Sequence, residues 1–359
     1  MTYREEKLKT ALANAEALID DARADSVYLG GSLTAGLGSP TSDVDVFVLT
    51  TDTEAQSGVA RQFKVDTERI DLETYTVAWV DSLLDKVGQW ESNRQRLRHN
   101  ALNATELDFL LRLRQIQVIK NSANLDRILA RLAEHDDRLR QMALSTWALS
   151  CNGWLSDFKG ALLDNDGESA GLIGQSVLVC VGKAAAAAAG DLYYGLKWVH
   201  QQLHRSIGDA FPHEVFRHWQ RGGWATEPAT ADGLDFLVFQ QTVGAAAQLL
   251  GWNGPAVKEW PFWETGTGQY RRNPQYNTIH LTEGVLLNYE LQRQLVVKPD
   301  VALVWALSNG RDEDEIVDAA VALGPHVCLP GEDPLGGDRA RELLALLERR
   351  GLVSKDLFR

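Results

Sequence analysis

The 359-residue sequence predicts an α+β protein built in three consecutive parts. Three observations support this fold class. Short apolar runs with period-two alternation are confined to the N-terminal part, helical periodicity dominates the middle, and a hairpin pattern followed by three short helices ends the chain. We therefore expect an α/β domain with a mixed sheet over residues 1–98, a helical bundle over 99–265, and a winged-helix-like module over 278–359.

The N-terminal part alternates between helix and strand. Apolar residues at helical spacing predict a helix over residues 4–24. Strands are expected at Ser26–Leu29, Asp43–Thr50 and Arg69–Val77. Residues 79–99 again have a helical pattern, which leads into the next part. This order of elements predicts a small α/β domain.

The middle of the chain is almost wholly helical in pattern. Breaks are expected at Asn165–Gly167 and Gly222–Gly223. The alanine run Ala184–Ala189 favours helix and permits close approach between helices. A helical bundle is the natural arrangement for such a series. The expected helices are Leu102–Ile119, Asn124–Ala133, Leu139–Lys159, Glu168–Gly190, Leu192–Ser206, His213–Gln220 and Thr230–Leu250.

The C-terminal part begins with a change in composition. Residues 251–277 are rich in Gly, Pro and aromatics, which predicts a long ordered loop or a linker. Within it, Arg271 and Arg272 form a small basic spot, for which a solvated pair is the default interpretation. The elements expected after it are strands at Thr278–Leu281, Val285–Tyr289 and Gln294–Val297, then helices at Asp300–Ser308, Glu313–Leu323 and Asp338–Arg350.

Two acids stand within the apolar run of the second predicted strand. Asp43 and Asp45 are two residues apart, so a strand directs both side chains to one face. Paired carboxylates repel each other, and a hard divalent cation such as Mg²⁺ relieves that repulsion. Eleven residues before Asp43, the first strand ends in Gly30, Gly31 and Ser32, whose backbone N–H groups can approach phosphates closely. These parts together predict metal-assisted phosphoryl or nucleotidyl transfer.

The segment Gly30-Gly31-Ser32, its spacer and Asp43-Val44-Asp45-Val46 resemble the signature of the DNA polymerase β-like nucleotidyltransferase superfamily. Among its members, small-molecule enzymes such as the aminoglycoside nucleotidyltransferases are the nearest in kind. The resemblance covers about the first quarter of the chain. It implies a third carboxylate on a later strand, where Asp71 and Glu73 share one face. We prefer Asp71, and leave open which of the two is the general base.

The resemblance also implies the ligands of the site. A nucleoside triphosphate would be the substrate, and two Mg²⁺ ions would be held by Asp43, Asp45 and Asp71. Lys197, beside Trp198, is similar to a Lys-Trp pair that meets the triphosphate in related enzymes, although a solvated lysine is an equal alternative. The residues expected to bind the nucleotide are Gly30, Gly31, Ser32, Ser42 and Lys197.

Composition limits the class of partner. The net charge is -13, which disfavours a protein that grips long nucleic acid and favours a small-molecule or peptide acceptor. The longest apolar run, Val177–Ala189, is interrupted by Lys183 and is too short to span a bilayer. The three cysteines show no metal-ligand spacing, and the N-terminus has no apolar signal core. We therefore expect a cytoplasmic protein with no membrane partner.

The last part has a second, weaker resemblance. Its quoted segments are Gly284–Asn288, Val304–Leu307, Asp314–Val317 and Leu343–Val353, and they resemble the PqqD-like family of winged-helix domains that bind precursor peptides. The Gly/Pro-rich insertion Gly324–Gly337 departs from that family.

These observations lead to one expected function and two alternatives. We expect a Mg²⁺-dependent nucleotidyltransferase that moves a nucleoside monophosphate, AMP by default, to a small-molecule or natural-product acceptor and releases pyrophosphate. One alternative is nucleotidylation of a peptide or protein recruited by the C-terminal module. The other is a catalytically silent scaffold that binds nucleotide or peptide. Homodimer formation is left open.

Overall fold

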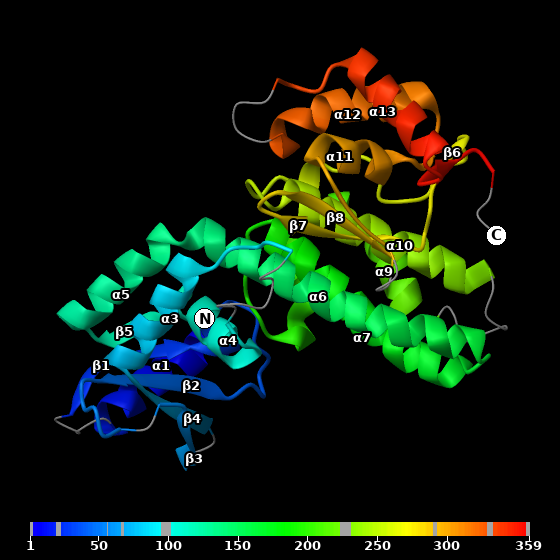
Figure 1. Cartoon of the computed structure of the whole chain (residues 1–359). Coiled ribbons are helices and arrows are strands. Elements are labelled where there is room, and N and C mark those ends of the chain that lie inside the picture. The colour runs from blue at the N-terminus through cyan, green and yellow to red at the C-terminus, as the bar shows by residue number, and fades with distance from the viewer. Residues whose placement is uncertain are drawn as a thin grey trace. The chain divides into compact units, whose positions relative to one another are not determined.

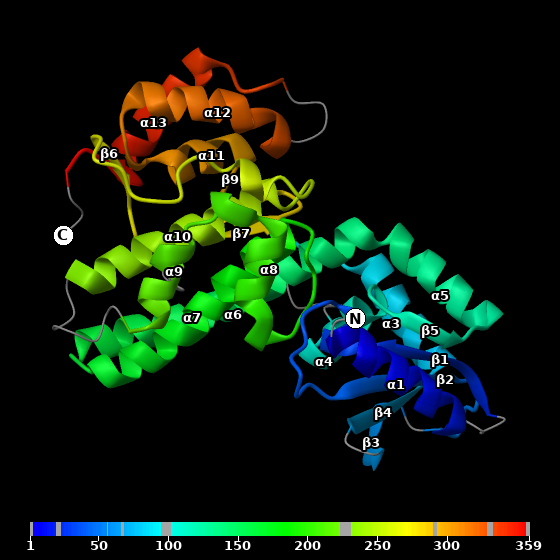
Figure 2. The same cartoon turned by 180° about the vertical axis from the view of Figure 1, so that it is seen from behind.

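The computed structural model describes residues 3–18, 23–55, 57–65, 68–94, 102–222, 231–289, 293–328 and 333–356. The described chain divides into two compact units, each treated by itself below (Figures 1 and 2). The first takes its residues from 1–91, 98–139 and 193–198, and the second from 92–97, 140–192 and 199–359.

The first unit is built on a five-stranded mixed sheet. Its strand order is β3-β4-β2-β1-β5, in which β2 and β4 run parallel and all other neighbours antiparallel. The strands are β1 (Ala24–Gly30), β2 (Val44–Thr50), β3 (Val59–Val65), β4 (Glu68–Thr76) and β5 (Gln117–Lys120). Its helices are α1 (Tyr3–Leu18), α2 (Gly31–Thr34), α3 (Val77–Gln89), α4 (Ala104–Leu113), α5 (Ala123–Glu134) and the short η1 (Leu196–Trp198).

The two faces of this sheet have different chemistry because side chains alternate along each strand. On one face Val44, Val46 and Ile70 join a buried aliphatic core against which Leu8 and Leu12 of α1 pack; α1 is seen in front of β1 and β2 in Figure 2. The other face carries an aromatic cluster in which rings of the strands meet Trp79 of α3 and Phe109 of α4. The rings are Tyr28, Phe47, Tyr75, Trp79 and Phe109.

The second unit is mainly helical at its start. The buried stretch of α7 packs against α8, α9 and α10. Its helices are α6 (Asp136–Leu163, apart from its first turn), α7 (Gly167–Ala188), α8 (Val199–Ser206), η2 (Gly208–Ala210), α9 (His213–Gln220), α10 (Ala231–Leu250) and η3 (Val257–Glu259). Of the helices that the structure describes, α7 is the one long and apolar enough to cross a membrane; most of its apolar window is buried, and soluble core helices meet the same criteria.

Two small sheets and three helices complete the second unit. The antiparallel sheet β7-β8-β9 has as strands β7 (Asn277–Leu281), β8 (Gly284–Tyr289) and β9 (Arg293–Val297). The other sheet, β10-β6-β11, joins β10 (Asn309–Arg311), β6 (Tyr270–Arg272) and β11 (Val353–Ser354). The helices are α11 (Pro299–Leu307), α12 (Glu313–Val327) and α13 (Gly337–Arg349), and α12 contacts both of the others.

The predicted α+β class and the mixed sheet are confirmed, and so is the order of hairpin and helices near the C-terminus. Whether that C-terminal arrangement is a winged helix stays a prediction. The single helix expected over Leu102–Ile119 is wrong, because α4 ends at Leu113 and Gln117–Lys120 forms β5 on the edge of the sheet. The helix expected over 79–99 ends at Gln89; its last residues, 95–99, lie outside the described chain.

Candidate active site

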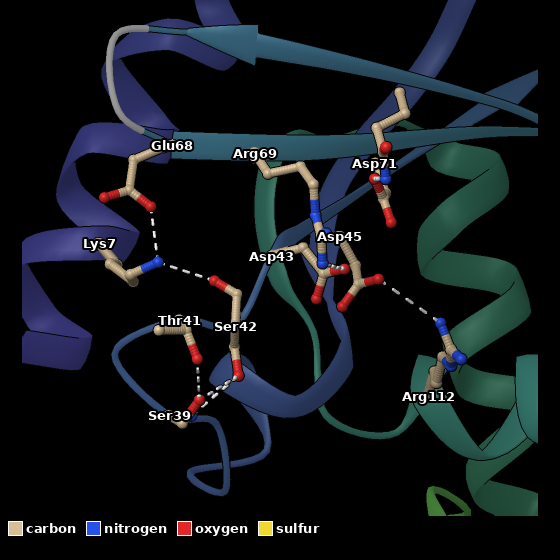
Figure 3. Close-up of polar contacts among 11 residues, drawn as sticks. Lys7, Ser39, Thr41, Ser42, Asp43, Asp45, Glu68, Arg69, Asp71 and Arg112 are labelled. Atoms are coloured by element: carbon tan, nitrogen blue, oxygen red, sulfur yellow. Dashed lines mark hydrogen bonds and ion pairs between the residues drawn. The ribbon is translucent and has the colours of Figure 1, made fainter.

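Four carboxylates gather on the aromatic face of the first unit's sheet. In the strand register, Gly30 of β1 lies opposite Asp45 of β2, which lies opposite Asp71 of β4. Asp43 is two residues before Asp45, and Glu73 is two residues after Asp71, so period-two alternation directs all four to one face. Figure 3 shows Asp43, Asp45 and Asp71 close together. We call Asp43, Asp45, Asp71 and Glu73 the acid cluster.

Asp43 is paired with an arginine of the neighbouring strand. Nη2 of Arg69 donates to Oδ2 of Asp43 at 2.7 Å (Figure 3). Burial alone would raise the pKa of Asp43, but the hydrogen bond and charge of Arg69 bring that pKa below its usual value. Asp43 is therefore ionised at neutral pH. The Arg69 side chain is 56% exposed, so solvent competes readily for this pair.

Asp45 is more buried than Asp43, with its side chain 17% exposed against 25%. Burial, together with the charges of Asp43, Glu73 and Asp71, raises the pKa of Asp45 to about 7. The opposing influence is Arg112 of α4, whose Nη1 lies 3.8 Å from Oδ1 of Asp45. The described protein groups therefore compensate a negative charge at Asp45 only in part.

The two carboxylates of β4 have neutral partners. Nε2 of Gln62 on β3 donates to Oδ1 of Asp71 at 2.7 Å. The Tyr75 hydroxyl donates to Oε2 of Glu73 at 2.5 Å, and burial together with this bond raises the pKa of Tyr75. Both carboxylates retain an oxygen outside these two bonds.

The glycine turn lies directly against the acid cluster. Gly31 has φ +77°, in the left-handed region that favours glycine, and a Cβ placed on it would lie 1.7 Å from Oδ2 of Asp45. The turn is closed by N–H groups of Leu37 and Gly38, which donate to the Ser32 carbonyl at 2.8 and 2.9 Å. Glycine at position 31 therefore lets the backbone and the Asp45 carboxylate approach each other.

Ser42 is engaged within its own loop. Its hydroxyl accepts a hydrogen bond from the Ser39 N–H at 2.9 Å, and its carbonyl accepts one from Nζ of Lys7 at 2.7 Å (Figure 3). Lys7 also pairs with Glu68 at 2.6 Å. These contacts hold Ser42 in the loop that enters β2.

Lys197 reaches the first unit as part of the segment Tyr193–Trp198. Lys197 is exposed in η1, with its Nζ 5.8 Å from the ring centre of Trp198, so it lies in a short 3₁₀ turn where a bundle helix was expected. Tyr193 of the same segment is buried against Ala35 and Leu37. Burial raises the pKa of Tyr193 to about 12, and its hydroxyl is hydrogen-bonded with Ser32.

Sequence reasoning missed Arg112 and Gln62 as neighbours of the site, and it allowed Arg69 only as a partner of Asp71 or Glu73, whereas the structure pairs Arg69 with Asp43. Arg69 had a signal, since it alternates with Asp71 and Glu73 along β4. Arg112 had a weaker one, the i,i+4 pair that it forms with Asp108 on α4. Neither spacing indicates which strand residue the side chain will meet.

The acid cluster has the donor atoms of a divalent metal site, although its side chains are not arranged around one point. Among the described residues, no three His, Cys, Asp or Glu side chains are arranged so that they could hold an ion. Asp43, Asp45 and Asp71 each contact another protein side chain. The donor chemistry nevertheless fits, because carboxylate oxygens are the ligands that Mg²⁺ takes. These residues suit the metal once the partner side chains move.

A mixed sheet with clustered carboxylates beside a glycine turn defines a protein of the nucleotidyl-transferring class. A family model described as a nucleotidyltransferase domain matches residues 15–124. The chain therefore contains a nucleotidyltransferase domain of the DNA polymerase β-like superfamily, and it is a transferase. The resemblance predicted from the sequence is confirmed for this domain.

Comparisons with solved structures and with curated proteins give one remote structural match and no sequence match. The chain is similar to a solved structure described as a nucleotidyltransferase-like protein from Exiguobacterium sibiricum 255-15, at 13% identity and a TM-score of 0.31. That similarity covers 68% of this chain and 78% of the other. No curated protein matches this chain in sequence.

Proposed function

We propose that this protein is a Mg²⁺-dependent nucleotidyltransferase that moves a nucleoside monophosphate, AMP by default, from a nucleoside triphosphate to a small-molecule or natural-product acceptor. The observation that carries the proposal is the acid cluster on adjacent strands beside the Gly31 turn. An acceptor oxygen or nitrogen would attack the α-phosphorus, and the bond from that phosphorus to the leaving oxygen would break. Pyrophosphate would leave with the electron pair.

Asp43, Asp45 and Asp71 are the residues that would hold the metal. When bound, Mg²⁺ supplies charge stabilisation at the attacking and leaving oxygens. Asp43 is ionised and exposed enough to exchange Arg69 for another cation. Asp45, held against Gly31, fixes the position of the ligand set relative to the backbone.

The remaining residues would handle the proton and the phosphates. Asp71 or Glu73 would take the proton of the acceptor, since each has a carboxylate oxygen outside the bond to Gln62 or Tyr75. The β- and γ-phosphates would lie on the Gly31 turn, where backbone N–H groups would be the donors. The residues proposed for nucleotide binding are Gly30, Gly31, Ser32, Ser42 and Lys197.

The rest of the chain has proposed roles as well. The C-terminal part would recruit the acceptor. Among the described residues the three cysteines form no disulfide, which suits the proposed cytoplasmic location.

Calorimetric titration tests this function without knowledge of the acceptor. ATP, CTP, GTP and UTP are each titrated with Mg²⁺ into wild type and into the double variant Asp43→Asn/Asp45→Asn. The proposal predicts Mg²⁺-dependent binding of at least one nucleotide, lost in the double variant. Equal binding by both proteins, or no binding to folded wild type, contradicts it and favours a silent scaffold.

A further inference from the structure

Arg112 faces the acid cluster from a separate element, the helix α4. Its Nη2 lies 2.7 Å from Oδ2 of Asp108, one turn earlier on the same helix, and its Nη1 lies 3.8 Å from Oδ1 of Asp45. Figure 3 shows Arg112 and Asp45 directed toward each other. The guanidinium therefore forms a close ion pair with Asp108 on its own helix and a longer, weaker one with Asp45 on β2.

The anchor itself is firm. Asn103 and Glu106 form a capping box at the start of α4, and Lys86 of α3 pairs with Glu106 at 2.7 Å. Phe109, between Asp108 and Arg112, packs in the aromatic cluster. The helix therefore holds the base of the Arg112 side chain in place, while the guanidinium can change partners.

Two polar atoms of this pair lack hydrogen-bond partners. Nε of Arg112 and Oδ1 of Asp108 are both buried and neither has a partner in the structure. A buried donor without a partner is destabilising, because it has lost its hydrogen bonds to water and gained none in the protein. This arrangement is understandable if the guanidinium has a second state in which its donors are satisfied by a ligand.

We infer that Arg112 is the resting counter-ion of Asp45, and that a divalent cation entering the acid cluster displaces it toward the bound nucleotide. This inference rests on the proposed function, because it assumes that Asp45 is a metal ligand. A cation on Asp45 repels the guanidinium, and Asp108 retains it at the edge of the site. The displaced guanidinium then offers its free donors to triphosphate oxygens, which are acceptors only.

Removing the charge of Arg112 should affect the acid cluster more than removing the charge of Arg69. The Arg69 side chain is 56% exposed and that of Arg112 is 27% exposed, so solvent screens Arg69 more strongly. Removing the Arg112 charge therefore leaves the acid cluster more negative in a less screened place. A divalent ion should bind such a cluster more tightly in the absence of nucleotide, by about ten-fold for a charge a few ångströms away.

The experiment measures Mn²⁺ binding without nucleotide, from the loss of the free-ion paramagnetic resonance signal. Wild type is compared with Arg112→Gln and Arg112→Met, two neutral variants, so that failure of one to fold leaves the other. Arg112→Lys retains the charge, and Arg127→Gln removes an exposed arginine that pairs with Asp81 on α3. Asp45→Asn shows which binding occurs at the acid cluster.

The expected result is about ten-fold tighter, Asp45-dependent Mn²⁺ binding in the neutral variants, with Arg112→Lys and Arg127→Gln near wild type. ATP binding with Mn²⁺ should weaken in the same neutral variants. Mn²⁺ affinity that is unchanged or lower in both neutral variants overturns this inference alone, provided that wild type binds Mn²⁺ through Asp45. Absence of Asp45-dependent binding in every protein, with and without ATP, overturns both the inference and the proposed function.

Discussion

A Cβ atom placed on Gly31 would lie 1.7 Å from Oδ2 of Asp45. The end of the first strand and the most buried carboxylate of the second are therefore in direct contact, and no side chain fits between them. This contact ties the phosphate-binding part of the proposed site to its metal-binding part. It also explains why a glycine is needed at a position where φ is +77°.

Replacing Gly31 with Ala should destroy the site and weaken the fold. The new methyl group must displace Asp45, and alanine is strained at this φ, so we expect a loss of roughly 2 kcal/mol in the free energy of unfolding. Mg²⁺-dependent nucleotide binding should disappear. Gly208 is the matched control, since its φ is +71° and nothing lies within 4 Å of its added Cβ. Gly208→Ala should cost about 1 kcal/mol and leave nucleotide binding intact. Equal binding losses in both variants would contradict this account.

Asp45→Asn should make the protein more stable and abolish its nucleotide binding. The wild-type carboxylate is buried beside three other acids, so removing its charge relieves repulsion in the metal-free protein. We expect the free energy of unfolding, measured in urea with a chelator present, to rise by about 1 kcal/mol. Nucleotide binding with Mg²⁺ should be lost. A variant that is clearly less stable than wild type would show that Asp45 has a structural role that this account omits.

Arg272 should be among the most sensitive positions of the second unit. It is buried, and its guanidinium donates to Gln241, Thr242, Val238 and the Ala306 carbonyl. Arg272→Ala removes all of these bonds at once, so the free energy of unfolding should fall by roughly 3 kcal/mol or more.

Arg272→Lys tests the geometry of that interaction. A single ammonium group cannot span the same acceptors, so the lysine variant should also be destabilised. The neighbouring Arg271 is less buried and supplies the control; Arg271→Ala should change stability by no more than about 0.5 kcal/mol. Urea denaturation of the three variants decides the matter, and similar effects at positions 271 and 272 would count against it.

His280 should make the second unit sensitive to acid. Burial lowers the pKa of His280 to about 4, and its ring stacks on Trp252 at a centroid distance of 4.4 Å. In the unfolded chain the pKa is about 6.5. The unfolded state therefore takes up this proton first, and stability falls as the pH drops from about 6.5 toward 4, by up to roughly 3 kcal/mol.

His280→Phe retains a ring against Trp252 and has no proton to gain. Its free energy of unfolding should depend less steeply on pH over that interval than that of wild type. The exposed His218 supplies a control, and His218→Phe should follow the wild-type profile. Parallel profiles for wild type and His280→Phe would falsify the assignment.

The sequence was sufficient to predict the shared face of the acids. Period-two alternation fixes the direction of Asp43 and Asp45 relative to each other, and the buried partners Val44 and Val46 lie on the opposite face as a strand requires. The parallel pairing of β2 and β4, which sets Asp71 opposite Asp45, belongs to the tertiary structure. It followed only from the resemblance, because a spacing along the chain does not determine which strands pair.

The predictions that were wrong also depended on tertiary contacts, which local sequence patterns do not determine. Gln117–Lys120 continues the apolar spacing of α4, and it is a strand because β1 offers it an open edge. Arg272 next to Arg271 suggested a solvated pair, yet the acceptors of Arg272 come from residues some thirty positions away along the chain. Arg112 lies far from Asp45 in sequence, so its contact with Asp45 depends on how α4 crosses the sheet.

The most direct test of the central claim is a crystal structure with Mn²⁺ and a non-hydrolysable ATP analogue, with the metal located by anomalous scattering. The account predicts Mn²⁺ bound to Asp43 and Asp45, the triphosphate on the Gly31 turn, and Arg112 turned from Asp45 toward the phosphates. Nucleotide bound elsewhere, or a metal that does not contact Asp45, would contradict it.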